Sequence, residues 1–214
     1  VLCEKPMALT VEDGRAMQAA AEKSGRLLQI GHCIRFWPEY AKTKELIDSG
    51  QYGKVRAAMF QRLSLTPTWA WDGWLMDPAR SGSAAMDLHI HDSDYVQYVF
   101  GMPKAVFSRT ARGPSNDADH IVTQYVYDED CVVTAEGGWA MSPTFGFEMS
   151  FNIVLEKATI VYDCTRTPAF RVCPAEGEAF TPTLPAGDGY TREIDHFARA
   201  AAGEALEPVV TPFQ

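Results

Sequence analysis

Residues 1–32 read VLCEKPMALTVEDGRAMQAAAEKSGRLLQIGH, and this stretch decides the fold of the N-terminal part of the chain. Its apolar start runs into a sharp X-Pro turn, which is typical of the end of a buried strand. Residues 9–25 predict a helix that begins at the N-cap Thr10 and stops at Gly25. Residues 27–32 form an apolar run of strand length. Strand, helix and strand in this order predict a βαβ unit with parallel strands.

The pattern changes after a second amphipathic helix, which we expect over residues 37–49. Strand patterns dominate the rest of the chain, and they alternate with only two further helices. We therefore expect a fold of class α/β plus α+β, with an α/β part at 1–52 and, at 53–214, a large and mostly antiparallel sheet covered by helices on one face. The expected strands are 54–63, 104–111, 120–128, 131–141, 145–156 and 157–163, and the further helices are 84–100 and 190–202.

Composition excludes several classes of protein. With 28 acidic against 19 basic residues and a net charge of −9, the chain lacks the dense Lys/Arg patches of a nucleic-acid-binding protein. No apolar run approaches the ~18–20 residues of a membrane span. Five irregularly spaced cysteines without a C-x-x-C pair favour reduced thiols in the cytoplasm over a zinc site or disulfide framework. The chain starts without Met, and we expect it to be a fragment of a longer protein.

The stretch SAAMDLHIHD at residues 83–92 concentrates two histidines and two aspartates. On a helix, residues four apart share a face and residues two apart do not. Asp87 and His91 therefore form one Asp/His pair, whereas His89 and Asp92 point elsewhere.

Three interpretations of this stretch stay open on the residues alone. An imidazole with a pKa near ~6.5 takes and gives protons at neutral pH, and a carboxylate one turn away orients it or a substrate hydroxyl. Alternatively, the H-x-H unit of His89 and His91 supplies two metal ligands of a hydrolase, although further ligands would be needed. The third interpretation is a helix whose Asp and His side chains are solvated or satisfied locally.

Separated motifs resemble those of the glucose–fructose oxidoreductase / inositol dehydrogenase / rhizopine-catabolism (Gfo/Idh/MocA) family. EKP at 4–6, followed by a helix, resembles the signature of the family, and SGSAAMDLHIHDSDYVQYVFG at 81–101 resembles its SGG-x-L-x-D-x-G-x-H-x-x-D helix. The resemblance covers nearly the whole chain and keeps the order of the motifs. Three more segments are similar to those of the family: GHCIRFWPEY at 31–40, YGKVRAAMFQR at 52–62 and YTREIDHFARAAAGE at 190–204.

The resemblance implies that residues 1–52 are the C-terminal part of a Rossmann-like domain that binds NAD or NADP, and that 53–214 bind substrate on an open sheet. It implies oxidation of a hydroxyl of a sugar, polyol or inositol, or the reverse reduction. Lys5 would sit beside the nicotinamide and the reacting hydroxyl, with Glu4 and Pro6 also at the cofactor. By the same resemblance His91 would be the general acid/base, and Asp87 would orient ring and substrate. The chain contains no G-x-G-x-x-G, so most of the cofactor site is expected outside it.

The chain departs from the family pattern at two positions. His89 stands where family members often have Gly, and SGS replaces SGG at Ser83. We expect Arg35, Trp74 and His89 to contact substrate, with a structural role as the alternative for His89. Arg35 and Arg62 could each hydrogen-bond to substrate hydroxyls or carboxylates, and an ion pair with an Asp is the favoured alternative for each of them. No metal ligand is predicted.

A partner is expected on the second face of the sheet. The stretch TQYVYDEDCVVTAEGGWAM at 123–141 carries apolar residues in both phases of its alternation, which predicts a homo-oligomer formed through that open face. A different class of function also stays open: a non-catalytic relative that binds a sugar-like ligand or a partner subunit.

Overall fold

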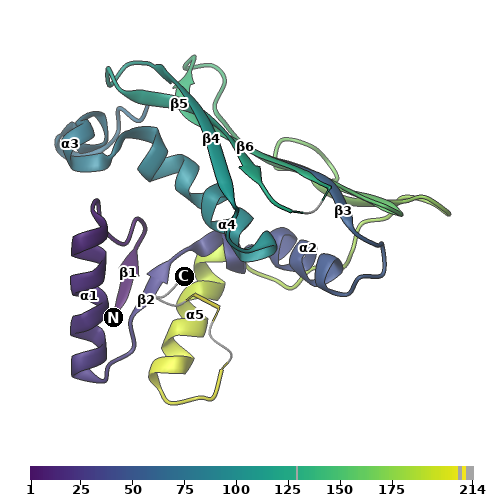
Figure 1. The fold of residues 1–214 in the computed structure, drawn as a ribbon, viewed down its shortest axis with the longest axis horizontal. Helices are drawn as coiled ribbons and strands as arrows, with labels where there is room; N and C mark the ends of the chain where they lie inside the picture. The colour runs from purple at the N-terminus through teal and green to yellow at the C-terminus, as the bar shows by residue number, and fades with distance from the viewer. Residues whose placement is uncertain (129, 207–208, 211–214) are drawn as a thin grey trace. The chain divides into compact units, whose positions relative to one another are not determined.

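A computed structural model describes residues 1–128, 130–206 and 209–210 (Figure 1). Their backbone contacts divide the chain into two compact units, each of which is described by itself. The first combines Val1–Ala41 with Pro185–Gln214, and the second is Lys42–Leu184. The C-terminal segment thus clusters with the first residues of the chain, whereas the domain boundary expected from the sequence falls after residue 52 and remains a prediction.

The first unit contains the predicted βαβ arrangement. Strand β1 (Leu2–Glu4) pairs in parallel with β2 (Gln29–Gly31), and helix α1 (Val11–Ser24) connects them. The N-cap prediction is confirmed, because the Thr10 side chain accepts a hydrogen bond from the backbone of Asp13 at 3.1 Å.

The C-terminal helix α5 (Gly189–Ala201) packs on the same unit. It lies against the 3₁₀ turn Cys33–Phe36, where Arg192 Nε donates to the carbonyl of Phe36 at 3.1 Å and the His196 ring lies 5.2 Å from the Phe36 ring. A small apolar core beneath consists of Leu28, Ile30, Phe36 and Val210. The first and last segments of the chain therefore complete one core together.

The second unit is built on a seven-stranded sheet in the order β4-β5-β6-β3-β7-β8-β9. Among the described residues of this sheet, only β3 and β6 pair in parallel, so the predicted mostly antiparallel character is confirmed. The last strand, β9, was not among the predicted strands. The strands are β3 (Val55–Leu65), β4 (Ala105–Arg112), β5 (Ala118–Val126), β6 (Val132–Met141), β7 (Phe147–Leu155), β8 (Ala158–Asp163) and β9 (Phe170–Pro174).

The two faces of this sheet differ. Helix α4 (Ile90–Phe100) runs along one face, where Phe60, Phe151 and Tyr95 are almost fully buried (Figure 1). Helix α2 (Pro38–Asp48) precedes β3 in the chain. The alternate positions of the strands place apolar side chains on the other face, where they are one-third to two-thirds exposed: Met59, Phe107, Val122, Val126, Val132 and Val154.

The helix predicted over 84–100 has two parts. It begins as a π-helical turn over Ala85–His89 and continues as α4. The short helix α3 (Pro78–Ser81) precedes it, after a 3₁₀ segment at Trp71–Met76. Between α3 and the π turn, Ser83 is buried in a left-handed conformation with φ of 61°, which glycine adopts at lower cost. Within the described residues, no helix is long and apolar enough to cross a membrane.

Candidate functional site

The EKP residues lie at the carboxyl end of a parallel strand. Glu4 is the last residue of β1, and Lys5 and Pro6 follow it at once. Glu4 packs against Gly31 at the end of β2: a Cβ at Gly31 would lie 3.0 Å from Glu4 Oε2 and 3.2 Å from its Cα. Parallel sheets flanked by helices bind their ligands outside this end of the strands, so Lys5 occupies the edge of the first unit that suits a ligand.

Arg35 has a documented structural contact in the same unit. Its side chain is only 5% exposed, and Nη1 donates to the carbonyl of Val209 at 2.8 Å. This hydrogen bond ties the turn after β2 to the C-terminal segment. The predicted role of Arg35 in substrate binding stays a prediction.

Helix α4 and the π turn before it are attached to the sheet by polar contacts. His89 Nε2 lies 2.9 Å from Thr123 Oγ1 on β5, and the same hydroxyl lies 2.9 Å from Ser108 Oγ on β4. One turn further on, Ser93 Oγ lies 2.8 Å from the hydroxyl of Tyr125. His89, which the helical spacing predicted to point away from the Asp/His pair, therefore faces the sheet.

The strongest of these contacts is a buried ion pair between Arg62 on β3 and Asp92 on α4. Arg62 Nε reaches Asp92 Oδ2 at 2.8 Å and Nη2 reaches Oδ1 at 3.1 Å, which is a two-pronged geometry. The two side chains are 4% and 0% exposed. The ion pair predicted for Arg62 is confirmed, with Asp92 as its partner.

The Asp87/His91 pair occupies the opposite side of this helix. At about 100° per residue, His91 lies roughly 160° around the axis from His89 and from Ser93. Asp87 precedes His91 by four residues and is half-buried, while His91 is buried. The helix thus separates an anchoring face of three polar residues from a face that carries a carboxylate and an imidazole.

The electrostatics of His89 differ from those needed for proton transfer. Burial lowers the pKa of His89 below its usual value, and the Asp92 carboxylate opposes this effect only in part. Its Nδ1 has no hydrogen-bond partner among the described residues, which fits a neutral ring that carries its proton on Nε2. The contact with Thr123 supports the structural alternative for His89, and its contact with substrate stays a prediction.

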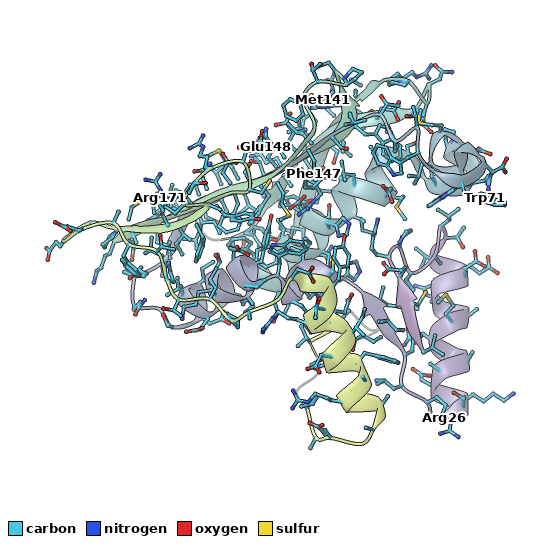
Figure 2. The ribbon with its side chains drawn as sticks, turned by 180° about the vertical axis from the view of Figure 1, so that it is seen from behind. Arg26, Trp71, Met141, Phe147, Glu148 and Arg171 are labelled. Carbon is cyan, nitrogen blue, oxygen red and sulfur yellow. The ribbon has the colours of Figure 1, made fainter. Side chains whose placement is uncertain are left out.

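Trp74 lies at the start of the same helical region. It is half-buried and packs on the cluster of Leu75, Ala84 and Trp139, and helix α3 lies between it and the π turn in the chain. By contrast, the Trp71 side chain, labelled in Figure 2, is 81% exposed. Contact of Trp74 with substrate remains a prediction, and its documented contacts are apolar.

Comparison with known proteins places the chain in a family. Residues 40–161, more than half of the chain, match the model of the GFO/IDH/MocA C-terminal domain. Residues 1–32 match that of an oxidoreductase family with an NAD-binding Rossmann fold. The chain belongs to the GFO/IDH/MocA family.

Relatives within the GFO/IDH/MocA family are longer than this chain. Inositol 2-dehydrogenase of Paracoccus denitrificans is 30% identical over 95% of the chain and 67% of the relative. The 1,5-anhydro-D-fructose reductase of Ensifer adhaerens is 28% identical over 87% of the chain and 57% of its own length. The aldose–aldose oxidoreductase structure from Caulobacter crescentus, with glycerol, covers the whole chain at a TM-score of 0.83 and 24% identity, and 64% of that chain is covered. This last likeness shows the fold.

The positions of His89 and His91 give little support to the metal hydrolase alternative. The His89 ring is committed to Thr123, and His91 lies on the other side of the helix, so the two rings do not converge on one ion. Within the described residues, no group of three or more His, Cys, Asp and Glu side chains is arranged to hold a metal.

The sequence reasoning missed Thr123 as the partner of His89, and it did not identify which Asp pairs with Arg62. Thr123 and Arg62 occupy positions of their strands that otherwise hold apolar, helix-facing residues such as Phe60. A polar side chain in the buried phase of a strand requires a partner, and this is the signal that could have pointed to them. It does not name the partner, because these residues lie 34 and 30 positions from His89 and Asp92.

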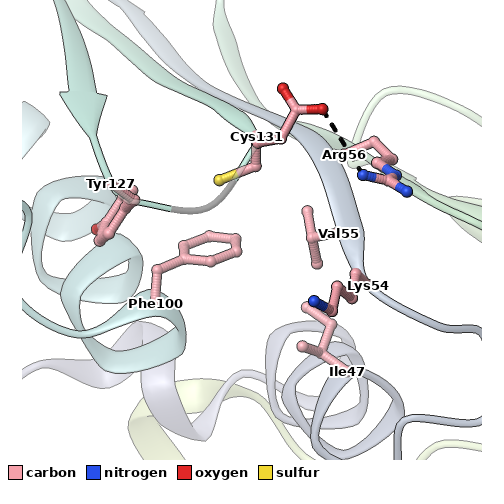
Figure 3. A pocket seen from close by; sticks show the side chains of 8 residues that line it. Ile47, Lys54, Val55, Arg56, Phe100, Tyr127 and Cys131 are labelled. Atoms are coloured by element: carbon pink, nitrogen blue, oxygen red, sulfur yellow. Dashed lines mark ion pairs between the residues drawn. The ribbon is translucent and has the colours of Figure 1, made fainter.

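A cavity of about 430 Å³ in the second unit lies away from the predicted site (Figure 3). It is lined by Phe100, at the far end of α4, and by Lys54, Arg56 and Cys131 among others. Phe100 lies nine positions after His91 on the helix, which corresponds to a rise of about 14 Å. Arg56 pairs with Glu156 at 2.7 Å, which neutralises much of the positive charge there. None of the predicted site residues lines this cavity, so we do not assign the chemistry to it.

Proposed function

We propose that the protein containing this chain is an NAD(P)-dependent oxidoreductase that interconverts a hydroxyl and a carbonyl group of a sugar, polyol or inositol. The observation that carries the proposal is the two-sided helix: the sheet takes up His89, Asp92 and Ser93, and leaves Asp87 and His91 on the opposite side. Family membership and the names of relatives, such as inositol 2-dehydrogenase and 1,5-anhydro-D-fructose reductase, support the reaction class.

The residues fit the reaction as follows. In oxidation, His91 accepts the proton of the reacting hydroxyl at an imidazole nitrogen, and in reduction it returns that proton. Asp87 accepts hydrogen bonds from the imidazole or from a substrate hydroxyl, which keeps both in position. The ammonium group of Lys5 stabilises the negative charge that develops on the reacting oxygen.

The first unit fits one rim of a dinucleotide site. Two parallel strands end side by side at Glu4 and Gly31, and their close approach leaves EKP at the edge where such folds hold the cofactor. The chain has no G-x-G-x-x-G, so its residues supply the rim and not the pyrophosphate loop. When bound, NAD or NADP would accept or donate the hydride; the protein manages the proton and the charge.

We also propose that the open sheet face binds a second copy of the protein. Its apolar side chains are exposed on neighbouring strands, with Phe107 at 62%, Val132 at 52% and Met59 at 49%. A patch of this kind favours burial against a partner. Met59→Lys should shift the sedimenting species toward monomer, whereas Val11→Lys on α1 should not. Monomeric wild-type protein at working concentration would refute this part.

The activity test uses the complete reading frame that contains this chain. Reduced-nicotinamide absorbance is followed with both cofactors against aldoses, inositols and polyols, for the wild type and for His91→Ala. The matched control is His120→Gln. The His120 ring is hydrogen-bonded to Glu136 at 2.8 Å on the sheet face that α4 does not cover. We expect turnover in wild type and control, and a loss of about 10²–10⁴-fold in His91→Ala.

Each outcome separates the alternatives. Equal turnover in wild type and His91→Ala would refute the role of His91. No turnover together with no nucleotide binding would favour the non-catalytic relative. The hydrolase alternative requires a bound metal, so stoichiometric metal in the purified protein would favour it.

A further inference from the structure

We infer that Arg62, Asp92 and Thr123 are positioning residues, which fix the rotation of α4 about its own axis and thereby the aim of Asp87 and His91. The inference rests on the proposed function for the catalytic use of Asp87 and His91. Its structural basis is independent, because the contacts involve only the anchoring face of the helix.

Apolar packing alone does not define this rotation. Tyr95 and Val96 of α4 are fully buried, but apolar burial is non-directional and tolerates small rotations of a helix. The Arg62–Asp92 pair is directional, since two parallel hydrogen bonds at 2.8 and 3.1 Å hold only while the carboxylate and the guanidinium stay in one plane. The His89–Thr123 contact at 2.9 Å adds a second fixed point one turn away.

The required accuracy is set by the size of a helix. Side-chain ends lie about 5–6 Å from the helix axis, so a rotation of about 10° displaces the His91 imidazole by roughly 1 Å. A displacement of this size at a reacting group lowers rates by as much as about 10²-fold. His89, which contacts Thr123, lies on the far side of the helix from His91, and Asp92 lies about 100° from His91 around the axis, so these contacts act on the imidazole through the helix.

The double variant Arg62→Met with Asp92→Leu separates positioning from stability. It removes both charges at once and replaces each side chain with an apolar one of similar length, a replacement that is often neutral or stabilising for buried ion pairs. The complete reading frame is used. The matched control is Arg56→Met, which removes an arginine of the same strand that pairs with Glu156 at the protein surface.

We expect the double variant to fold with an undiminished thermal midpoint and to lose about 10- to 100-fold in kcat, with KM changed far less. The NMR titration of His91 should move in the double variant and stay unchanged in Arg56→Met. Arg62→Lys, which keeps the charge but lacks the planar fork, should give a smaller change in the same direction and serves if the double variant does not fold.

A folded double variant, or a folded Arg62→Lys, with wild-type kcat and a wild-type His91 titration would overturn the inference. If the wild type turns over none of the substrates, the proposed function fails. The His91 titrations of wild type, Arg62→Lys and control still decide whether the anchors position the imidazole, because Arg62→Lys keeps both charges of the pair.

Discussion

The side chain of His89 lies directly on Gly137 of β6. A Cβ added at Gly137 would come within 2.9 Å of His89 Cβ and 3.0 Å of its Cα. The π turn therefore approaches the sheet so closely that the strand has no room for a side chain at this position.

Gly137→Ala is expected to destabilise the second unit by about 1–3 kcal/mol, because the atoms it meets include backbone, which cannot swing away. Urea unfolding measures the change. Gly14→Ala is the matched control, since a Cβ there meets only Met7 Sδ at 3.9 Å in helix α1. That control should gain about 0.5–1 kcal/mol. An unchanged free energy of unfolding in Gly137→Ala would contradict the close contact.

Ser83→Gly is expected to stabilise the protein. The left-handed conformation at φ of 61° costs a non-glycine residue about 1–2 kcal/mol in the folded state. The added freedom of glycine in the unfolded chain offsets about 0.4–1 kcal/mol of this gain. The buried Ser83 hydroxyl also has no hydrogen-bond partner among the described residues. The net gain should be roughly 0.5–1 kcal/mol in denaturant unfolding. Ser83→Ala separates the two causes, because it removes the hydroxyl and keeps the strain; a gain as large as that of Ser83→Gly would show that strain is unimportant.

The stability of the protein should depend on pH through His89. Burial holds the pKa of His89 below 6.5, so the unfolded chain binds a proton more readily than the folded one. This contribution is fully present above pH 6.5 and is lost as pH falls through 6.5 toward the lowered folded pKa, by at most about 1.4 kcal/mol per pH unit. In His89→Gln this part of the slope should disappear, and in His120→Gln it should persist. Unfolding free energies at pH values from 7 downward test it; parallel curves for wild type and His89→Gln would count against a lowered pKa.

Asp92→Ala is expected to cost about 3–5 kcal/mol, because it leaves the Arg62 guanidinium buried without its counter-charge. Asp48→Ala provides the comparison. Asp48 pairs with Lys44 at 2.6 Å on the surface of α2, where loss of the pair should cost about 0.5 kcal/mol or less. Thermal or chemical unfolding of the two variants measures the contrast, and equal losses would show that burial of the pair is unimportant.

Local features of the fold were predictable from sequence because they depend on local chemistry. Helix α1 begins at the N-cap Thr10 and ends at Gly25, as expected. The spacing of Asp87 and His91 predicted that both lie on one side of the helix, and the contact of His89 with the sheet lies on the other side. Strand β9 was not predicted, since it has only five residues and ends in Pro174, which makes its pattern too short to recognise.

The π turn and the anchors could not be predicted in the same way. The residues from Ala85 to Phe100 give one continuous helical pattern, and nothing in it distinguishes a π turn from an α turn. The turn forms where the chain leaves the strained Ser83 and must set His89 on Gly137. Such contacts join residues tens of positions apart, and a single sequence does not record which distant residues meet.

The first unit unites Val1–Ala41 with the segment from Pro185 onward, and this has a consequence for synthesis on the ribosome. Between these segments lie about 140 residues, which take roughly 7–30 s to translate at about 5–20 residues per second. During that interval Leu28 and Ile30 lack their core contact with Val210, which has not yet been synthesised. The second unit already has every strand of its own sheet. The second unit can therefore fold before the first unit is complete, and a ribosome stalled ahead of α5 would leave Leu28 and Ile30 without their contact to Val210.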